Sequence, residues 1–155
     1  MRIQLKVEEL HGGLKSFITF ICEFPRLHTR LLINAFVDTG SSHTSIALSQ
    51  LLKRGINVGG VIDKNDFEEI MIGGAKHKGH PIKERFDVRF RTQDNKTVHL
   101  KPPKLYVYLP YTENKEGWAL SYSLPSIIGV DFLIHHNLSL YFNPSKKVAW
   151  LEKEE

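Results

Sequence analysis

The chain has 155 residues, 41% of them hydrophobic and 25% charged, which is ordinary globular usage and does not indicate disorder. One hydrophobic core is comfortable at this length, so we expect a single domain over residues 1–155. Lysine and arginine exceed aspartate and glutamate by 21 − 17 = 4, a modest excess that is spread along the chain. Nucleic-acid binding is therefore not expected, and a basic β-barrel that binds nucleic acid is the lowest-ranked alternative.

The cysteine count and the hydropathy pattern exclude further classes of protein and of site. Cys22 is the only cysteine, which excludes a disulfide framework and a CxxC-type metal site. Residues 1–9 alternate between apolar and polar types and lack the continuous apolar region of a signal peptide. No apolar run is long enough to span a membrane. We therefore expect a cytoplasmic protein that has no membrane contact.

The first half of the sequence predicts strands followed by one helix. Its strand-like segments, which alternate or are rich in β-branched and aromatic residues, are 2–9, 14–24 and 31–37. The turn residues His11-Gly12-Gly13 make the first two a hairpin. Residues 45–54 carry apolar side chains at helical spacing and are followed by Gly55, so they predict a helix.

The second half continues the strand pattern. Its strand-like segments are 68–72, 75–81, 85–92, 98–109, 138–142 and 147–151. Gly73-Gly74 forms a tight turn between the first two, and Pro102-Pro103 interrupts the fourth. Residues 58–66 and 111–123 are predicted as loops, and residues 125–136 as a strand that breaks into a helical turn. About nine strands with one full and one short helix predict an all-β domain of the barrel kind.

The segment with the clearest chemical meaning is Asp38-Thr39-Gly40-Ser41. An apolar strand delivers an acid to a turn in which Gly40 supplies backbone freedom, and small hydroxyl residues follow. Taken alone the triplet is weak evidence, because Asp and Gly are standard turn residues. Its simplest interpretation is a strand that ends in an Asx-turn.

Two further segments raise its specificity. Ile127-Ile128-Gly129-Val130-Asp131 is an apolar-apolar-Gly segment that precedes a C-terminal helix, and Met71-Ile72-Gly73-Gly74-Ala75 is a Gly-rich hairpin midway between it and the Asp38 loop. In this order, the three segments resemble the active-site loop, the second apolar strand and the flap of retropepsin-like aspartic proteases. The resemblance covers most of the chain.

The resemblance implies a closed acid-protease barrel with a psi-loop, a flap hairpin and one or two short helices. Asp38 is then the catalytic acid, while Thr39, Gly40 and Ser41 support its loop. Ile128 and Gly129 form the psi-loop partner strand. The residues implied to close over or line bound peptide are Ile72, Gly73, Gly74, Ala75 and His43.

The chemistry of this family needs two carboxylates that share one proton. The other aspartates are Asp63, Asp66, Asp87, Asp94 and Asp131, and none precedes Thr-Gly or Ser-Gly. The sequence therefore predicts a homodimeric aspartic endopeptidase, with one Asp38 from each chain and a peptide or protein as its substrate. Residues 1–9 and 148–153 alternate well enough to pair between chains, although the interface stays unassigned. The alternative is a retropepsin-fold dimerisation or peptide-binding module that does not cleave.

Several other residues have a simpler interpretation beside a functional one. Asp131 is expected to cap the helix after Gly129 and not to be catalytic. His135-His136 lacks a third ligand, so neither a metal site nor a cofactor is expected. His77 and His80 could make activity respond to pH, with ordinary exposed positions as the alternative. Viral members usually carry acidic residues after the catalytic triplet, where this chain has Ser42 and His43.

Overall fold

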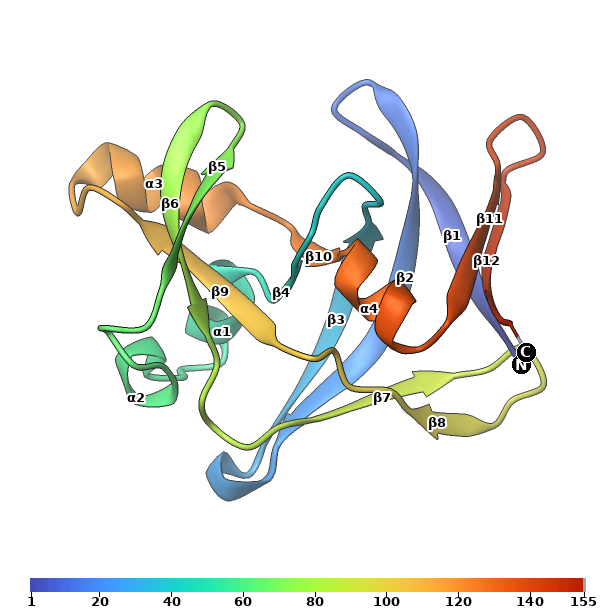
Figure 1. Ribbon diagram of the computed structural model, residues 1–155, viewed down its shortest axis with the longest axis horizontal. Coiled ribbons are helices and arrows are strands. Elements are labelled where there is room, and N and C mark those ends of the chain that lie inside the picture. Colours follow the sequence, from blue (N-terminus) through green and yellow to red (C-terminus); the bar gives the residue numbers. More distant parts are fainter. Residues whose placement is uncertain (155) are drawn as a thin grey trace.

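The computed structural model describes residues 1–154 and consists mostly of β-strands (Figure 1), which confirms the all-β class predicted from the sequence. The strands are β1 Arg2–Leu10, β2 Gly13–Phe24, β3 Thr29–Val37, β4 Thr44–Ser45, β5 Glu68–Ile72, β6 Ala75–Pro81, β7 Asp87–Arg91, β8 Thr97–His99, β9 Leu105–Pro110, β10 Ser126–Ile128, β11 Leu138–Asn143 and β12 Val148–Lys153. The helices are α1 Leu48–Lys53, α2 Val58–Val61, α3 Lys115–Ser123, α4 Val130–His135 and the 3-10 turn Pro25–Leu27.

The long β2–β3 hairpin forms the spine of the structure, and its alternation explains the core. The two strands pair without a break from Phe17↔Phe36 to Phe24↔Thr29. Side chains at every second position of β3 point inward and are fully buried, while Leu32 between them is 69% exposed. This period of two is what a strand with one buried face requires. The same hairpin carries Asp38, which follows the last residue of β3.

The strands do not form a closed ring. Their hydrogen-bonded order is β11-β12-β1-β2-β3-β10-β4-β9-β6-β5, with β7 added to β2 and β8 to β7. Since β11 and β5 stand at opposite ends of this order, the closed barrel that the resemblance implied is not confirmed.

The two ends of the chain pair with each other. The first half of β1 lies antiparallel to β12, from Arg2↔Glu152 to Leu5↔Ala149, and its second half pairs with β2. The sequence left open whether these terminal segments pair between chains. In this structure their backbone bonds are made within one chain.

Three local predictions were wrong. The helix predicted over residues 45–54 begins at Leu48, because Thr44 and Ser45 pair with β9 as strand β4. The predicted loop 58–66 begins with the short helix α2. The predicted loop 111–123 contains α3, whose N-cap Asn114 accepts a hydrogen bond of 2.7 Å from the Gly117 N–H. The chain thus has more helix than the one or two short elements expected.

None of the helices within residues 1–154 is both long and apolar enough to cross a membrane.

Candidate active site

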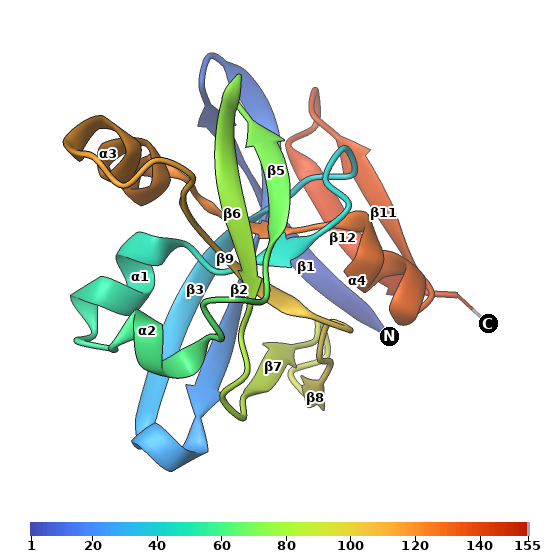
Figure 2. The ribbon, with the colours of Figure 1, turned by 60° about the vertical axis from the view of Figure 1, so that its left-hand side comes forward.

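Asp38 lies where three strands cross in a psi-shaped arrangement. Strand β10 runs parallel to β3, with Ile128 opposite Val37, and antiparallel to β4, with Ile127 opposite Ser45. The Asp38 N–H donates to the Ile128 carbonyl at 3.0 Å. Because β10 is inserted between β3 and β4, the segment that connects those two strands has to loop away from the sheet. Figure 2 shows this loop beside the β5–β6 hairpin.

The Asp38 carboxylate is fixed on one side only. Its Oδ1 accepts a hydrogen bond of 2.9 Å from the Gly40 N–H, and its carbonyl accepts one of 3.1 Å from the Ser41 N–H. This is the Asx-turn that the triplet alone predicted. The second oxygen, Oδ2, makes no hydrogen bond within residues 1–154. The half-buried carboxylate therefore keeps acceptor capacity for a group from outside this chain.

The loop after Asp38 closes on itself and on β10. The Ser41 hydroxyl donates to the His43 carbonyl at 2.9 Å, and the Val130 N–H donates to the Ser41 carbonyl at 2.8 Å. Gly129 sits directly under this loop: a Cβ built there would lie 2.4 Å from the His43 carbonyl oxygen and 2.9 Å from that of Ser41. Only glycine fits so close to backbone atoms that cannot turn aside.

Thr44 and Asp131 lock the base of the loop. The buried Thr44 hydroxyl accepts from the Gly129 N–H at 3.0 Å and donates to Asp131 Oδ1 at 2.7 Å, while the Thr44 N–H donates to Asp131 Oδ2 at 3.3 Å. The N-cap of α4 is Gly129, which makes no side-chain cap bond, so the prediction that Asp131 caps this helix was wrong. The sequence did not indicate that Thr44 and Asp131 bond to each other beneath the loop, since they are 87 positions apart.

The predicted flap is a regular hairpin. Strands β5 and β6 pair from Glu68↔Gly79 to Ile72↔Ala75. Gly73 and Gly74 close the turn with φ of 58° and 81°, the left-handed values that a tight hairpin turn requires. At the tip, Met71 is 62% exposed and Ile72 is half-buried, so apolar side chains stay available there.

His43 connects the loop to the base of this hairpin. Its Nε2 lies 3.0 Å from Glu68 Oε2, and its ring packs against that of Tyr106 with 4.5 Å between centroids. The expectation that His43 lines a substrate cleft stays a prediction. The structure does show a direct contact between the Asp38 loop, through His43, and the β5–β6 hairpin, through Glu68.

His77 and His80 on β6 are both buried, so the alternative of ordinary exposed positions was wrong. His77 is 2% exposed and its Nδ1 lies 3.1 Å from the Ser121 hydroxyl of α3. Burial lowers the pKa of His77 below its usual value. His80 Nδ1 lies 3.2 Å and 3.0 Å from the carbonyl oxygens of Asp63 and Asp66. Helix α3, which packs against β9 and which the sequence did not predict, supplies the Ser121 hydroxyl that His77 contacts.

The described residues contain no group of three histidine, cysteine or acidic side chains positioned to hold a metal ion. Of the histidine pair near the end of α4, His136 directs its Nε2 at the Lys101 carbonyl. Its ring packs edge-on against both Phe132 and His135. Burial lowers the pKa of His136 as well. These contacts give the pair a structural role.

No family model and no curated protein matches this chain. Among solved structures, the chain is similar to a retropepsin-like aspartic protease from Rickettsia conorii, and the similarity covers 97% of this chain and 89% of that one. The two sequences are 17% identical, and the TM-score is 0.48. At that distance, the role of each site residue has to be judged from its own contacts.

Proposed function

We propose that this chain is an aspartic endopeptidase that acts as a homodimer, with one Asp38 carboxylate from each protomer. The observation that carries the proposal is the position of Asp38 where β3, β10 and β4 meet. There the Gly40 N–H holds one carboxylate oxygen and the other stays available. A loop that is braced from below by Gly129 and Thr44 presents this acid in a fixed orientation. Fixed geometry is what a catalytic carboxylate needs.

The second carboxylate has to come from another chain. Asp131 lies close to the Asp38 loop in space, but both of its oxygens accept hydrogen bonds from Thr44, and Oδ1 also accepts one from the Phe132 N–H at 2.8 Å. A carboxylate with these partners is a structural acceptor and is not free to share a proton with Asp38. A twofold axis beside the Asp38 loop supplies the missing acid, because an isologous dimer places identical residues opposite each other.

Thr39 is suited to such an axis. Its side chain is exposed, and its hydroxyl makes no hydrogen bond within residues 1–154. In the dimer that we propose, each Thr39 bonds to the loop of the partner subunit and holds the two carboxylates at hydrogen-bond distance.

The reaction then follows from two carboxyl groups that hold one proton between them. The ionised carboxylate removes a proton from a bound water, and the water oxygen attacks the carbonyl carbon of the peptide. The protonated partner gives its proton to the carbonyl oxygen, which forms a neutral gem-diol. As this intermediate collapses and its C–N bond breaks, the protonated carboxyl gives its proton to the leaving nitrogen. The ionised carboxylate takes the proton of one gem-diol hydroxyl, whose oxygen becomes the carbonyl oxygen of the new carboxylic acid, so the pair again holds one proton. No metal or cofactor takes part in these steps.

The flap and His43 complete the proposed substrate cleft. Residues 72–75 close over an extended peptide, and their apolar members Ile72 and Ala75 contact its side chains. His43 lies between the catalytic loop and Glu68, so it forms one wall where the peptide enters.

The test is cleavage that depends on Asp38. The protein is incubated with a diverse peptide mixture at several pH values, and products are identified by mass spectrometry beside an Asp38→Asn variant. We expect cuts that the variant does not make. A folded dimer that makes no such cuts at any pH would replace the proposal with the non-cleaving module.

A mixing experiment tests the shared site separately. Wild type and Asp38→Asn are unfolded together, refolded at equal amounts and assayed at fixed total protein. If each active unit needs two intact Asp38 residues, activity falls to about one quarter of the wild-type value, since random pairing makes only that fraction of dimers fully wild type. A fall to one half would show that each chain works alone.

A further inference from the structure

A concave surface lies away from the Asp38 loop, between the β1–β2–β3 sheet and the β7–β8 hairpin. It encloses about 840 Å³, which is within the range of ligand-binding sites, and it shares no residue with the loop, the psi-strand or the flap. The residues that line it are Ile3, Gln4, Leu5, Lys6, Phe17, Thr19, Phe20, Ile21, Arg30, Leu32, Arg89, Phe90, Arg91, Thr92, Gln93 and Thr97. We call this surface the β2 groove.

The groove arises because β2 changes partners along one edge. Its pairing with β1 ends at Phe17, and its pairing with β7 begins at Ile21. Between those points neither β1 nor β7 pairs with β2. Beyond this gap Gln93, two residues after β7, donates its N–H to the carbonyl of Arg2 in β1 at 2.8 Å. The opening therefore lies between β1, β2 and β7, whose hydrogen bonds fix these edges.

The floor of the groove presents apolar side chains to solvent. Ile21 and Leu32 are opposite each other on β2 and β3, and both belong to the outward-facing set of their strands. Leu32 is 69% exposed, a large value for a leucine in the middle of a sheet. No other element of the described chain covers Leu32, so its apolar atoms are open to contact by a partner.

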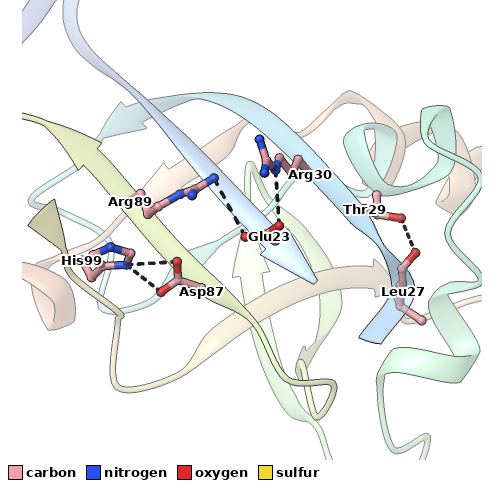
Figure 3. A network of polar contacts seen from close by, with 7 residues as sticks. All are labelled: Glu23, Leu27, Thr29, Arg30, Asp87, Arg89 and His99. Carbon is pink, nitrogen blue, oxygen red and sulfur yellow. Dashed lines mark hydrogen bonds and ion pairs between the residues drawn. The ribbon is translucent and has the colours of Figure 1, made fainter. Parts of the chain in front are cut away.

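The rim of the groove is basic. Four of its lining residues are cationic, namely Lys6, Arg30, Arg89 and Arg91, and none is acidic. Arg30 and Arg89 share a single carboxylate, Glu23, at 3.3 Å and 3.9 Å, as Figure 3 shows. Arg91 donates to the neutral amide oxygen of Asn95 at 2.8 Å. The neighbouring Asp87 is engaged by His99 at 3.1 Å (Figure 3). Within residues 1–154, positive charge on this rim exceeds the negative charge that neutralises it.

We propose that the β2 groove binds an extended acidic segment of a partner protein, in which carboxylates alternate with apolar residues. The lining places apolar and cationic side chains next to each other. Leu32 and Ile21 lie in one row across the sheet, and Arg89 on β7 follows them in the same row. An extended peptide turns alternate side chains to opposite sides, so one that lies with its apolar side against Ile21 and Leu32 has its carboxylates on the other side, within reach of the long cationic side chains of the rim. The surface is thus a docking site separate from the peptide-cleaving site, and it stands whether or not Asp38 cleaves.

The experiment uses the Asp38→Asn protein, so that a peptide probe is not cut. The probe is a fluorescein-labelled peptide with the core Glu-Leu-Glu-Leu-Glu between Gly-Ser ends. Its binding is measured by fluorescence anisotropy as the protein concentration is raised to about 1 mM. Control peptides replace Glu by Gln, Glu by Lys, or Leu by Ser. We expect the acidic-apolar peptide to bind at least about fivefold more tightly than each control, and higher salt to weaken it.

Two pairs of variants place the binding in the groove. Leu32→Glu changes the exposed floor, and Leu52→Glu is its control, since Leu52 is a 45% exposed leucine on α1. Arg91→Glu changes the rim. Its control is Lys53→Glu, which makes the same change of charge at an exposed residue next to Leu52 on α1. We expect each groove variant to weaken binding at least about fivefold while its control does not.

Melting temperatures confirm that all four variants are folded. Equal binding by the acidic-apolar peptide and its Gln or Ser control, or equal loss in the groove and control variants, would overturn the proposal. Tighter binding of a single-stranded oligonucleotide of the same charge would overturn it as well, since the site would then recognise phosphate.

Discussion

Gly129→Ala is the sharpest structural test of the candidate site, because the contact that it creates is with backbone. The new Cβ would lie 2.4 Å from the His43 carbonyl oxygen, 2.7 Å from its carbon and 2.9 Å from the Ser41 oxygen. A side chain could rotate away, but these atoms belong to the loop that holds Asp38. Either β10 or the loop has to move.

The cost belongs at the upper end of what overpacking produces, about 3 kcal/mol, since three backbone atoms are displaced together. With a urea m-value of about 2 kcal/mol/M, the midpoint of unfolding falls by about 1.5 M. The matched control is Gly59→Ala in α2, where the nearest atom is a flexible side-chain oxygen at 3.6 Å. Alanine is favoured over glycine inside a helix, so this midpoint should stay the same or rise slightly.

Urea unfolding is followed by far-UV circular dichroism at one protein concentration for all three proteins, because the dimer that we propose would make the midpoint depend on concentration. Cleavage by Gly129→Ala is measured in parallel, below the start of its unfolding transition. A Gly129→Ala midpoint that coincides with that of the wild type would refute the close approach of β10 to the Asp38 loop.

Two further predictions concern buried titratable groups. Burial raises the pKa of the Cys22 thiol to about 12. We therefore expect Cys22 to react with iodoacetamide at pH 8 at least about 100-fold more slowly in the native protein than in denaturant. Comparable rates would show that the core around β2 opens readily. Because burial lowers the pKa of His77, the unfolded chain binds this proton more readily, and stability should fall as pH drops below about 6.5, the unfolded value. His77→Asn keeps a hydrogen-bonding group near Ser121 but does not titrate, so the urea midpoint of this variant should depend less on pH between 7.5 and 5. An unchanged slope would show that other groups cause the pH dependence.

The β5–β6 hairpin shows what the sequence could predict. Residues 68–72 and 75–81 were expected as strands around Gly73-Gly74, and β5 and β6 have those bounds. Double glycine specifies the left-handed turn, and the flanking residues have no competing helical pattern. The end of β3 at Asp38 was predictable for a similar reason, since an apolar strand stops at a turn-forming triplet.

Helix α3 shows where local pattern fails. Its large apolar residues Trp118, Leu120 and Tyr122 are all at least 40% exposed, whereas the small residue Ser121 is completely buried. The apolar stripe by which helices are usually recognised is therefore missing. The remaining signal was the Asn114 cap, which satisfies the Gly117 N–H. Burial of His77 depends on this helix and could not be predicted without it.

The candidate site divides into a part that one chain makes and a part that it lacks. The support of Asp38 is complete within the chain, because Gly129, Thr44 and Asp131 bond or pack beneath the loop. The second acid of the proposed pair is missing from it, since Asp131 is already engaged by Thr44. Damage to the first part should lower both stability and cleavage, whereas Asp38→Asn should remove cleavage and leave the unfolding midpoint nearly unchanged. If the two variants behaved alike in both measurements, Asp38 would belong to the structural support of the loop, and the proposed shared carboxylate pair would lose its basis.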